Sequence, residues 1–175
     1  ADKILLDVKF GSGAFMKKLP EAIELAQVRV DIGTGIGRET LAMLSSMEQP
    51  LGTEIGNSRE VAEAIEVLSG GGDSRLRDFC LEMASRMLIM AKPELSFAAA
   101  QTQVRQLLVS GAGLAKLREF VEAQGGDGRV VADLNLLGRA ACSLSIRAQT
   151  AGFVGAMHSA ELGRAAILLG AGREK

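Results

Sequence analysis

The sequence predicts an α/β fold: part of a parallel, mixed-sheet α/β domain with flanking helices. Apolar runs at 4–10 and 38–46 are typical of buried strands, and the amphipathic segment 20–33 between them is typical of a helix. Strand, helix and strand at this spacing indicate a right-handed parallel crossover. The pattern changes late in the chain, where 143–148 and 152–157 alternate polar and apolar residues, as half-buried strands do.

The composition favours a helix-rich globular domain. The chain has 175 residues, of which 47% are hydrophobic, with six Phe and no Trp or Tyr, so its core is expected to consist of aliphatic side chains and Met. A net charge of −1 gives no basic surface for nucleic acid or membrane lipid. Cys80 and Cys142 belong to no Cys-x-x-Cys pair, and we expect both to be reduced, buried thiols of a cytoplasmic protein, with a disulfide as the alternative.

The first strand leads into a glycine loop. Gly11 and Gly13 follow the apolar run and permit a close approach of the backbone to a ligand, while Lys9 and Ser12 add a cation and a hydroxyl. In open α/β sheets ligands bind at this end of the strands. A tight turn without a ligand is the alternative interpretation of the local pattern. Because Ala1 lies so close to a predicted buried strand, we expect the chain to be a piece of a longer protein.

The helix after this loop should begin near Pro20 and end in the glycine cluster 33–37. A rival interpretation makes 28–32 a strand that enters the glycine loop of an S-adenosylmethionine-dependent methyltransferase, with Glu54 on the ribose hydroxyls. One helix capped by glycine explains the segment more economically, because the amphipathic pattern continues without a break into residue 28.

The middle of the chain predicts several further helices. Asn57 or Ser58 should cap the first of them, and Glu94 or Ser96 should begin a later one, before a last helix at 114–123. Between them 76–91 is expected to pack on the core through one face, whose members are spaced as on a helix stripe: Leu76, Phe79, Cys80, Met83, Met87 and Met90.

The last part of the chain contributes a helix at 161–169 and the only histidine, His158. A lone histidine invites a catalytic assignment, but here a surface or cap position is the expectation. The chain has neither a Cys/His cluster with zinc spacing nor a Ser-His-Asp set.

Four long motifs occur along the chain. The segment 7–16 reads Asp-Val-Lys-Phe-Gly-Ser-Gly-Ala-Phe-Met, and 50–65 contains Pro-Leu-Gly, Ile-Gly-Asn and Glu-Val-x-Glu-Ala-Ile in that order. The third is Ala-Gln-Gly-Gly-Asp at 123–127, and the fourth is the passage from Gly-Phe-Val to Leu-Gly-Ala-Gly-Arg at 152–173. Together these motifs resemble the pyrimidine nucleoside phosphorylases, the family that includes thymidine phosphorylase. The resemblance places 1–125 in the second half of the family's α/β domain.

The same resemblance makes 126–175 a linker and the start of the C-terminal α+β domain. The chain then corresponds to the central and early C-terminal portion of a pentosyltransferase that cleaves a pyrimidine nucleoside with phosphate. The phosphate loop, the catalytic His and the groups that grip the pyrimidine precede this portion in relatives. No catalytic residue is therefore assigned here, and the segment alone is expected to be inactive.

The resemblance also implies substrate-binding and metal sites. Phe15 matches an apolar contact with the pyrimidine ring, the alternative being a plain core phenylalanine. Gly11, Ser12, Gly13 and Ala14 form the loop around it. Lys9 would contribute to the substrate site by bracing either Asp7 or the phosphate loop.

A structural potassium ion would be held by the carbonyls of Leu51 and Glu54 and by the Glu63 carboxylate, although Glu63 could also be a solvated helix residue. A homodimer without organic cofactor, nucleic acid or membrane is implied for the complete protein. A non-catalytic scaffold fragment remains an alternative.

Overall fold

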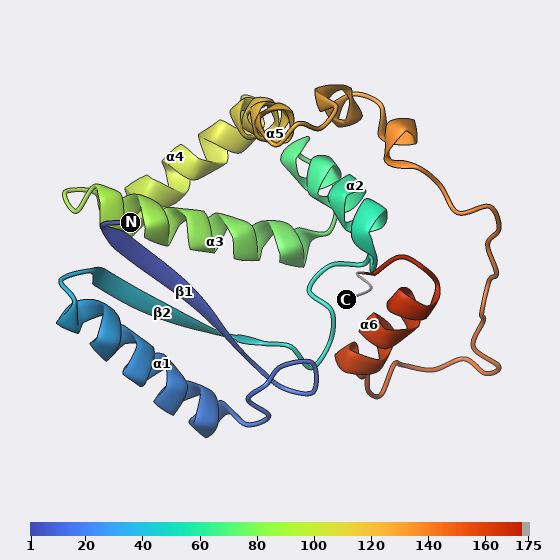
Figure 1. Ribbon diagram of the computed structural model, residues 1–175, viewed down its shortest axis with the longest axis horizontal. Coiled ribbons are helices and arrows are strands. Elements are labelled where there is room, and N and C mark those ends of the chain that lie inside the picture. Colours follow the sequence, from blue (N-terminus) through green and yellow to red (C-terminus); the bar gives the residue numbers. More distant parts are fainter. Residues whose placement is uncertain (173–175) are drawn as a thin grey trace.

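The computed structural model describes residues 1–172 and contains two strands and six α-helices (Figure 1). The strands are β1 (Lys3–Phe10) and β2 (Glu39–Ser46). The helices are α1 (Leu19–Gly35), α2 (Asn57–Leu68), α3 (Ser74–Ala91), α4 (Phe97–Val109), α5 (Ala112–Ala123) and α6 (Ser159–Leu168). Two short 3₁₀ helices, Gly128–Val131 and Leu134–Leu137, follow α5. The mixed α/β class expected from the sequence is confirmed.

The two strands are parallel and in an unbroken register from Lys3 opposite Glu39 to Phe10 opposite Ser46. Helix α1 covers one face of this pair and α3 lies on the other, as Figure 1 shows. Side chains alternate between the faces, so Val8 packs with Ala22 and Ala26 of α1 while Lys9 lies against α3. The predicted strand, helix and parallel strand are thus confirmed.

Helix α1 lies very close to β2 at Gly33, which is buried. A Cβ built there would lie 2.1 Å from Oγ1 and 2.8 Å from Cβ of Thr40. Rotating the threonine side chain would not remove the second contact, so helix and strand would have to separate. This close approach explains why a glycine is placed inside the last turn of a helix, where it costs about 1 kcal/mol of helix propensity relative to alanine.

Gly33→Ala is therefore expected to lower the free energy of unfolding by about 2 kcal/mol, as measured by urea denaturation. The matched control is Gly35→Ala in the same turn, where an added Cβ meets nothing within 4 Å. That control should be neutral or slightly stabilising. Equal behaviour of the two variants would show that the contact with Thr40 does not limit the packing of α1.

The remaining helices form a second group, in which α3 packs on α4, and α5 contacts both α4 and α2. Ser96 caps α4, as predicted, by accepting a hydrogen bond from the Ala99 amide at 3.2 Å. The prediction that Asn57 or Ser58 caps α2 is wrong by one residue. Gly56 takes that position with φ of 114°, a left-handed value that favours glycine, and its amide donates to the Glu60 carboxylate at 2.9 Å.

The predicted core stripe of α3 is partly wrong. Met90 is buried as expected, but Met87 is 58% exposed and Cys80 is also exposed. The buried line runs instead through Leu81 and Ser85, whose hydroxyl donates to the Leu81 carbonyl at 2.6 Å and so needs no outside partner. A helix with apolar residues on two adjoining stripes can present either one, and packing against α4 and β1 decides between them.

The predicted strands at 143–148 and 152–157 are not formed. Residues 138–158 have neither helical nor strand structure and run as an extended, exposed segment that links the 3₁₀ helices to α6 (Figure 1). The alternating apolar side chains are present but open to solvent, Phe153 fully so. A strand requires a hydrogen-bonded partner, and no described residue pairs with this segment. Among the described residues, no helix has the length and apolar character needed to cross a membrane.

Candidate functional site

The glycine loop after β1 is closed by hydrogen bonds from its own amides. The Ser12 amide donates to the Glu48 carboxylate at 3.1 Å and the Gly13 amide to the Met47 carbonyl at 3.1 Å. The amides of Gly11 and Ala14 bond within the turn. These backbone N–H groups already have acceptors within the protein. A ligand would therefore contact the surface and the side chains of the loop, and would receive no hydrogen bond from these amides.

Glycine is required in this loop because other segments pass very close to it. A Cβ on Gly11, whose φ is 112°, would lie 2.9 Å from the Glu48 amide nitrogen, and one on Gly13 would lie 2.7 Å from Cβ of Ser159. The loop is thus clamped between the end of β2 and the start of α6. The Ser159 hydroxyl is buried there without a hydrogen-bond partner among the described residues.

Lys9 braces the face of the sheet that lies toward α3. Its contact with Asp7 is one of the two roles predicted for it. Its ammonium group pairs with the Asp7 carboxylate at 2.5 Å and donates to the Ser45 hydroxyl at 2.9 Å, while Ser45 donates to Asp7 at 2.5 Å. The same ammonium lies 4.8 Å from the ring centre of Phe79 on α3. This three-membered network joins the ends of β1 and β2 and faces α3.

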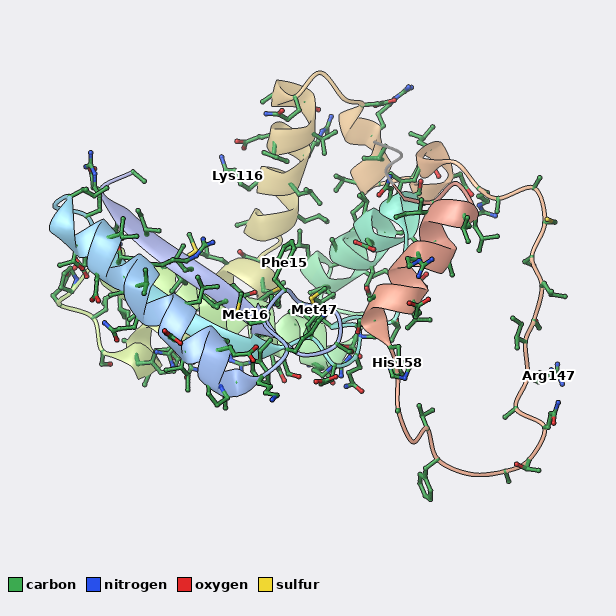
Figure 2. The ribbon with its side chains drawn as sticks, turned by 60° about the horizontal axis from the view of Figure 1, so that its bottom comes forward. Phe15, Met16, Met47, Lys116, Arg147 and His158 are labelled. Carbon is green, nitrogen blue, oxygen red and sulfur yellow. The ribbon has the colours of Figure 1, made fainter. Side chains whose placement is uncertain are left out.

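A cavity of about 580 Å³ lies beside the loop, with Gly13, Phe15, Met16, Lys17 and Met47 in its wall. Figure 2 shows Phe15, Met16 and Met47 together at this end of the strands. Phe15 is 99% exposed, so its ring is available to a ligand and contributes nothing to the core. The Lys17 ammonium donates to the carbonyls of Ser12 and Ala14 at 3.0 and 2.7 Å, which fixes the loop that carries Phe15.

The second predicted site is the loop that precedes α2. Glu63 is only 5% exposed, and its carboxylate accepts from the Thr53 amide at 2.7 Å, the Thr53 hydroxyl at 2.9 Å and the Glu54 amide at 3.4 Å. A Cβ on Gly52 would lie 2.1 Å from this carboxylate. Glu63 is therefore a buried loop-organising group, and the alternative of a solvated helix residue is wrong.

No basic side chain among residues 1–172 pairs with the buried Glu63 carboxylate. A buried charge without an ionic partner is costly, and oxygen donors from a loop suit a monovalent cation. Clusters of three or more His, Cys, Asp or Glu side chains suited to a metal do not occur in the described part of the chain. Any cation here would therefore depend on carbonyl oxygens together with Glu63.

The other two predicted oxygen donors lie in different surroundings. The Leu51 carbonyl accepts two hydrogen bonds from Arg75, at 3.0 and 2.7 Å. The Glu54 carbonyl is part of the loop backbone. Its side chain forms a bidentate ion pair with Arg59, with nitrogen to oxygen distances of 2.7 and 2.6 Å. This hydrogen bonding to Arg59 lowers the pKa of the Glu54 carboxyl and raises the pKa of Arg59.

His158 is exposed and occupies the cap position of α6, as predicted, without a side-chain capping bond (Figure 2). Cys80 and Cys142 are unpaired, as predicted, but both are exposed, so the expectation that they are buried is wrong.

Sequence reasoning also missed Glu48, Arg75 and Ser159. Glu48 could have been found, because it lies two residues after β2 and the ends of parallel strands meet at one edge. The other two give no signal in the sequence.

The methyltransferase interpretation is wrong. It requires a strand at 28–32, but those residues lie inside α1, which continues to Gly35.

Comparison with known proteins agrees with the motifs. The chain is 43% identical over 173 residues to the pyrimidine-nucleoside phosphorylase of Bacillus subtilis, and 42% identical over 173 residues to that of Geobacillus stearothermophilus. The corresponding protein of Staphylococcus haemolyticus is 41% identical over 174 residues. Each match covers 99% of this chain and 40% of the relative, so the chain spans about two-fifths of their length. No family model matches the chain. The resemblance drawn from the motifs is confirmed.

Proposed function

We propose that this chain, which matches part of the pyrimidine-nucleoside phosphorylases over nearly its whole length, forms one wall of an active site for phosphorolysis of pyrimidine nucleosides. In that reaction phosphate attacks the anomeric carbon of the nucleoside, the bond to the base breaks, and a pentose 1-phosphate and a free pyrimidine result. The observation that carries the proposal is the cavity beside the glycine loop, which lies at the carboxyl ends of two parallel strands.

Phe15 is the residue with the clearest role in this proposal. Its exposed ring is placed by a loop that is fixed on three sides, by Glu48, Met47 and Lys17. An exposed aromatic ring beside a cavity can stack on a planar base, and the anchored loop backbone sets where that ring lies. Gly11, Ser12 and Gly13 would shape the wall around it.

Lys9 would act as a positioning residue. Its ammonium is engaged by Asp7 and Ser45 on the face toward α3, so it holds the strand end from which the loop departs. The chemistry of the reaction, which consists of holding phosphate and stabilising the leaving base, would fall to residues outside this chain.

A potassium ion would be held between the loop that precedes α2 and Glu63 of that helix. The buried Glu63 carboxylate and its proximity to Gly52 support this, because the charge has no basic partner among the described residues. Leu51 and Glu54 would add carbonyl oxygens. The ion would stabilise the loop electrostatically and would take no part in bond breaking.

The complete protein would be a cytoplasmic homodimer. Unpaired, exposed cysteines fit a reducing compartment, and large apolar side chains exposed at the end of α6, such as Leu168 and Leu169, fit a surface that is covered in an assembly.

The test is phosphate-dependent release of uracil or thymine from uridine and thymidine by the complete protein, with and without potassium. We expect release that requires phosphate and increases with potassium. The closed amides of the glycine loop favour the scaffold alternative, in which the loop binds nothing. Failure to release either base from a folded, complete protein would support the scaffold and contradict the enzyme.

A further inference from the structure

Arg75, the second residue of α3, reaches back to the loop that precedes α2. Its Nε donates to the Leu51 carbonyl at 3.0 Å, and one terminal nitrogen donates to the carbonyls of Leu51 and Pro50 at 2.7 and 2.5 Å. The partners are separated by 24 and 25 residues in the sequence. A single guanidinium group thus holds two consecutive carbonyl oxygens of the loop.

The Leu51 carbonyl has no acceptor capacity left in this arrangement. A carbonyl oxygen has two lone pairs, and two Arg75 nitrogens use both of them. A guanidinium is charged at every physiological pH. Arg75 therefore provides this carbonyl with the positive charge and directed contact that a bound cation would provide.

The side chain of Arg75 has room to leave. Arg75 is exposed and lies on a cavity of about 510 Å³ whose wall also contains Pro50, Leu51, Glu48 and Met157. Withdrawal of Arg75 into this space would free the Leu51 carbonyl without moving α3. Glu63 approaches the loop through Thr53 and the Glu54 amide and forms no ion pair with Arg75.

We infer that Arg75 is a built-in cation of the loop that precedes α2 and competes with potassium for the Leu51 carbonyl. The inference rests on the proposed cation site. Two positive charges cannot share one carbonyl oxygen without strong repulsion at a few ångströms. Potassium gains the full oxygen set only when Arg75 withdraws, so the residue sets the concentration at which potassium acts.

The test is the melting temperature of the complete protein, titrated with KCl against choline chloride at constant ionic strength, for the wild type and Arg75→Met. Methionine keeps the length of the side chain and removes every N–H donor. We expect the variant to melt lower without potassium and to reach half of its potassium-induced gain at about one-tenth of the wild-type concentration.

Two further variants complete the design. Arg77→Met, on the same helix and away from residues 50 and 51, should leave the potassium titration unchanged. Arg75→Lys keeps a positive charge and much of the packing, and it replaces Arg75→Met in the potassium titration if the methionine variant fails to fold. It should respond to less potassium than the wild type, because an ammonium group lacks the fixed fork of donors.

Half-saturation within twofold of the wild type in the folded Arg75 variants would overturn the inference. So would the absence of any potassium effect in all of the proteins. Neither result bears on phosphorolysis itself, which is measured separately by base release in potassium-free buffer.

Discussion

Glu63→Ala is expected to lower the free energy of unfolding by about 3 kcal/mol. The change removes the acceptor of three hydrogen bonds, from the amide and hydroxyl of Thr53 and the amide of Glu54, in a place where the carboxylate is buried. Urea denaturation in potassium-free buffer measures the loss. Glu66→Ala is the matched control, because Glu66 is an exposed residue one turn later on α2, and it should cost less than about 0.5 kcal/mol.

Glu63→Gln separates the structural role of this residue from its role toward the cation. The amide side chain keeps one acceptor oxygen for Thr53 and loses the charge, so a smaller loss of about 1.5 kcal/mol is expected, together with a weaker response of stability and activity to potassium. An unchanged potassium titration would remove Glu63 from the ligand set while leaving its hydrogen bonds to the loop intact.

Phe15→Ala is expected to raise the KM for the nucleoside about tenfold, since stacking of a base on an aromatic ring contributes about 1–3 kcal/mol. The KM for phosphate should change less than twofold. Stability should not change, because the ring is 99% exposed and packs on nothing in the core. Initial rates of base release with each substrate varied in turn measure both constants in the complete protein.

The control for this variant is Phe120→Ala, which removes another largely exposed ring, on α5. It should leave both constants at their wild-type values. Equal increases in the two KM values for Phe15→Ala would show that the ring shapes the loop generally, and would contradict its placement against the base.

The sequence predicted the elements whose side chains follow one clear period. Strand β1, helix α1 and strand β2 were predicted because an apolar run, an amphipathic stretch and glycines agree on the same boundaries. The buried face of α3 was not predicted correctly, because the helix has two adjoining apolar stripes. Packing against the neighbouring elements buries Leu81 and leaves Met87 exposed. The strands expected within 143–157 failed because alternation describes a side-chain pattern, while a strand also needs a partner for its backbone.

The candidate sites divide in the same way. Phe15 and Glu63 were found because they belong to motifs that are continuous in the sequence. Arg75 and Ser159 were not, because their contacts depend on how helices α3 and α6 meet loops that are far away in the chain. The residues around the start of α3 give no indication that Arg75 will donate hydrogen bonds to a carbonyl of a preceding loop.

The register of the two strands sets a limit on length variation. Residues pair at a constant offset of 36 from Lys3 with Glu39 onward, and Lys9 meets Ser45 and Ser12 meets Glu48 at the same offset. A one-residue insertion or deletion inside either strand would turn every following side chain to the opposite face. It would separate Lys9 from Ser45 and detach the glycine loop from its anchor. Natural relatives should therefore vary in length within the exposed segment 138–158 and keep these strands free of gaps.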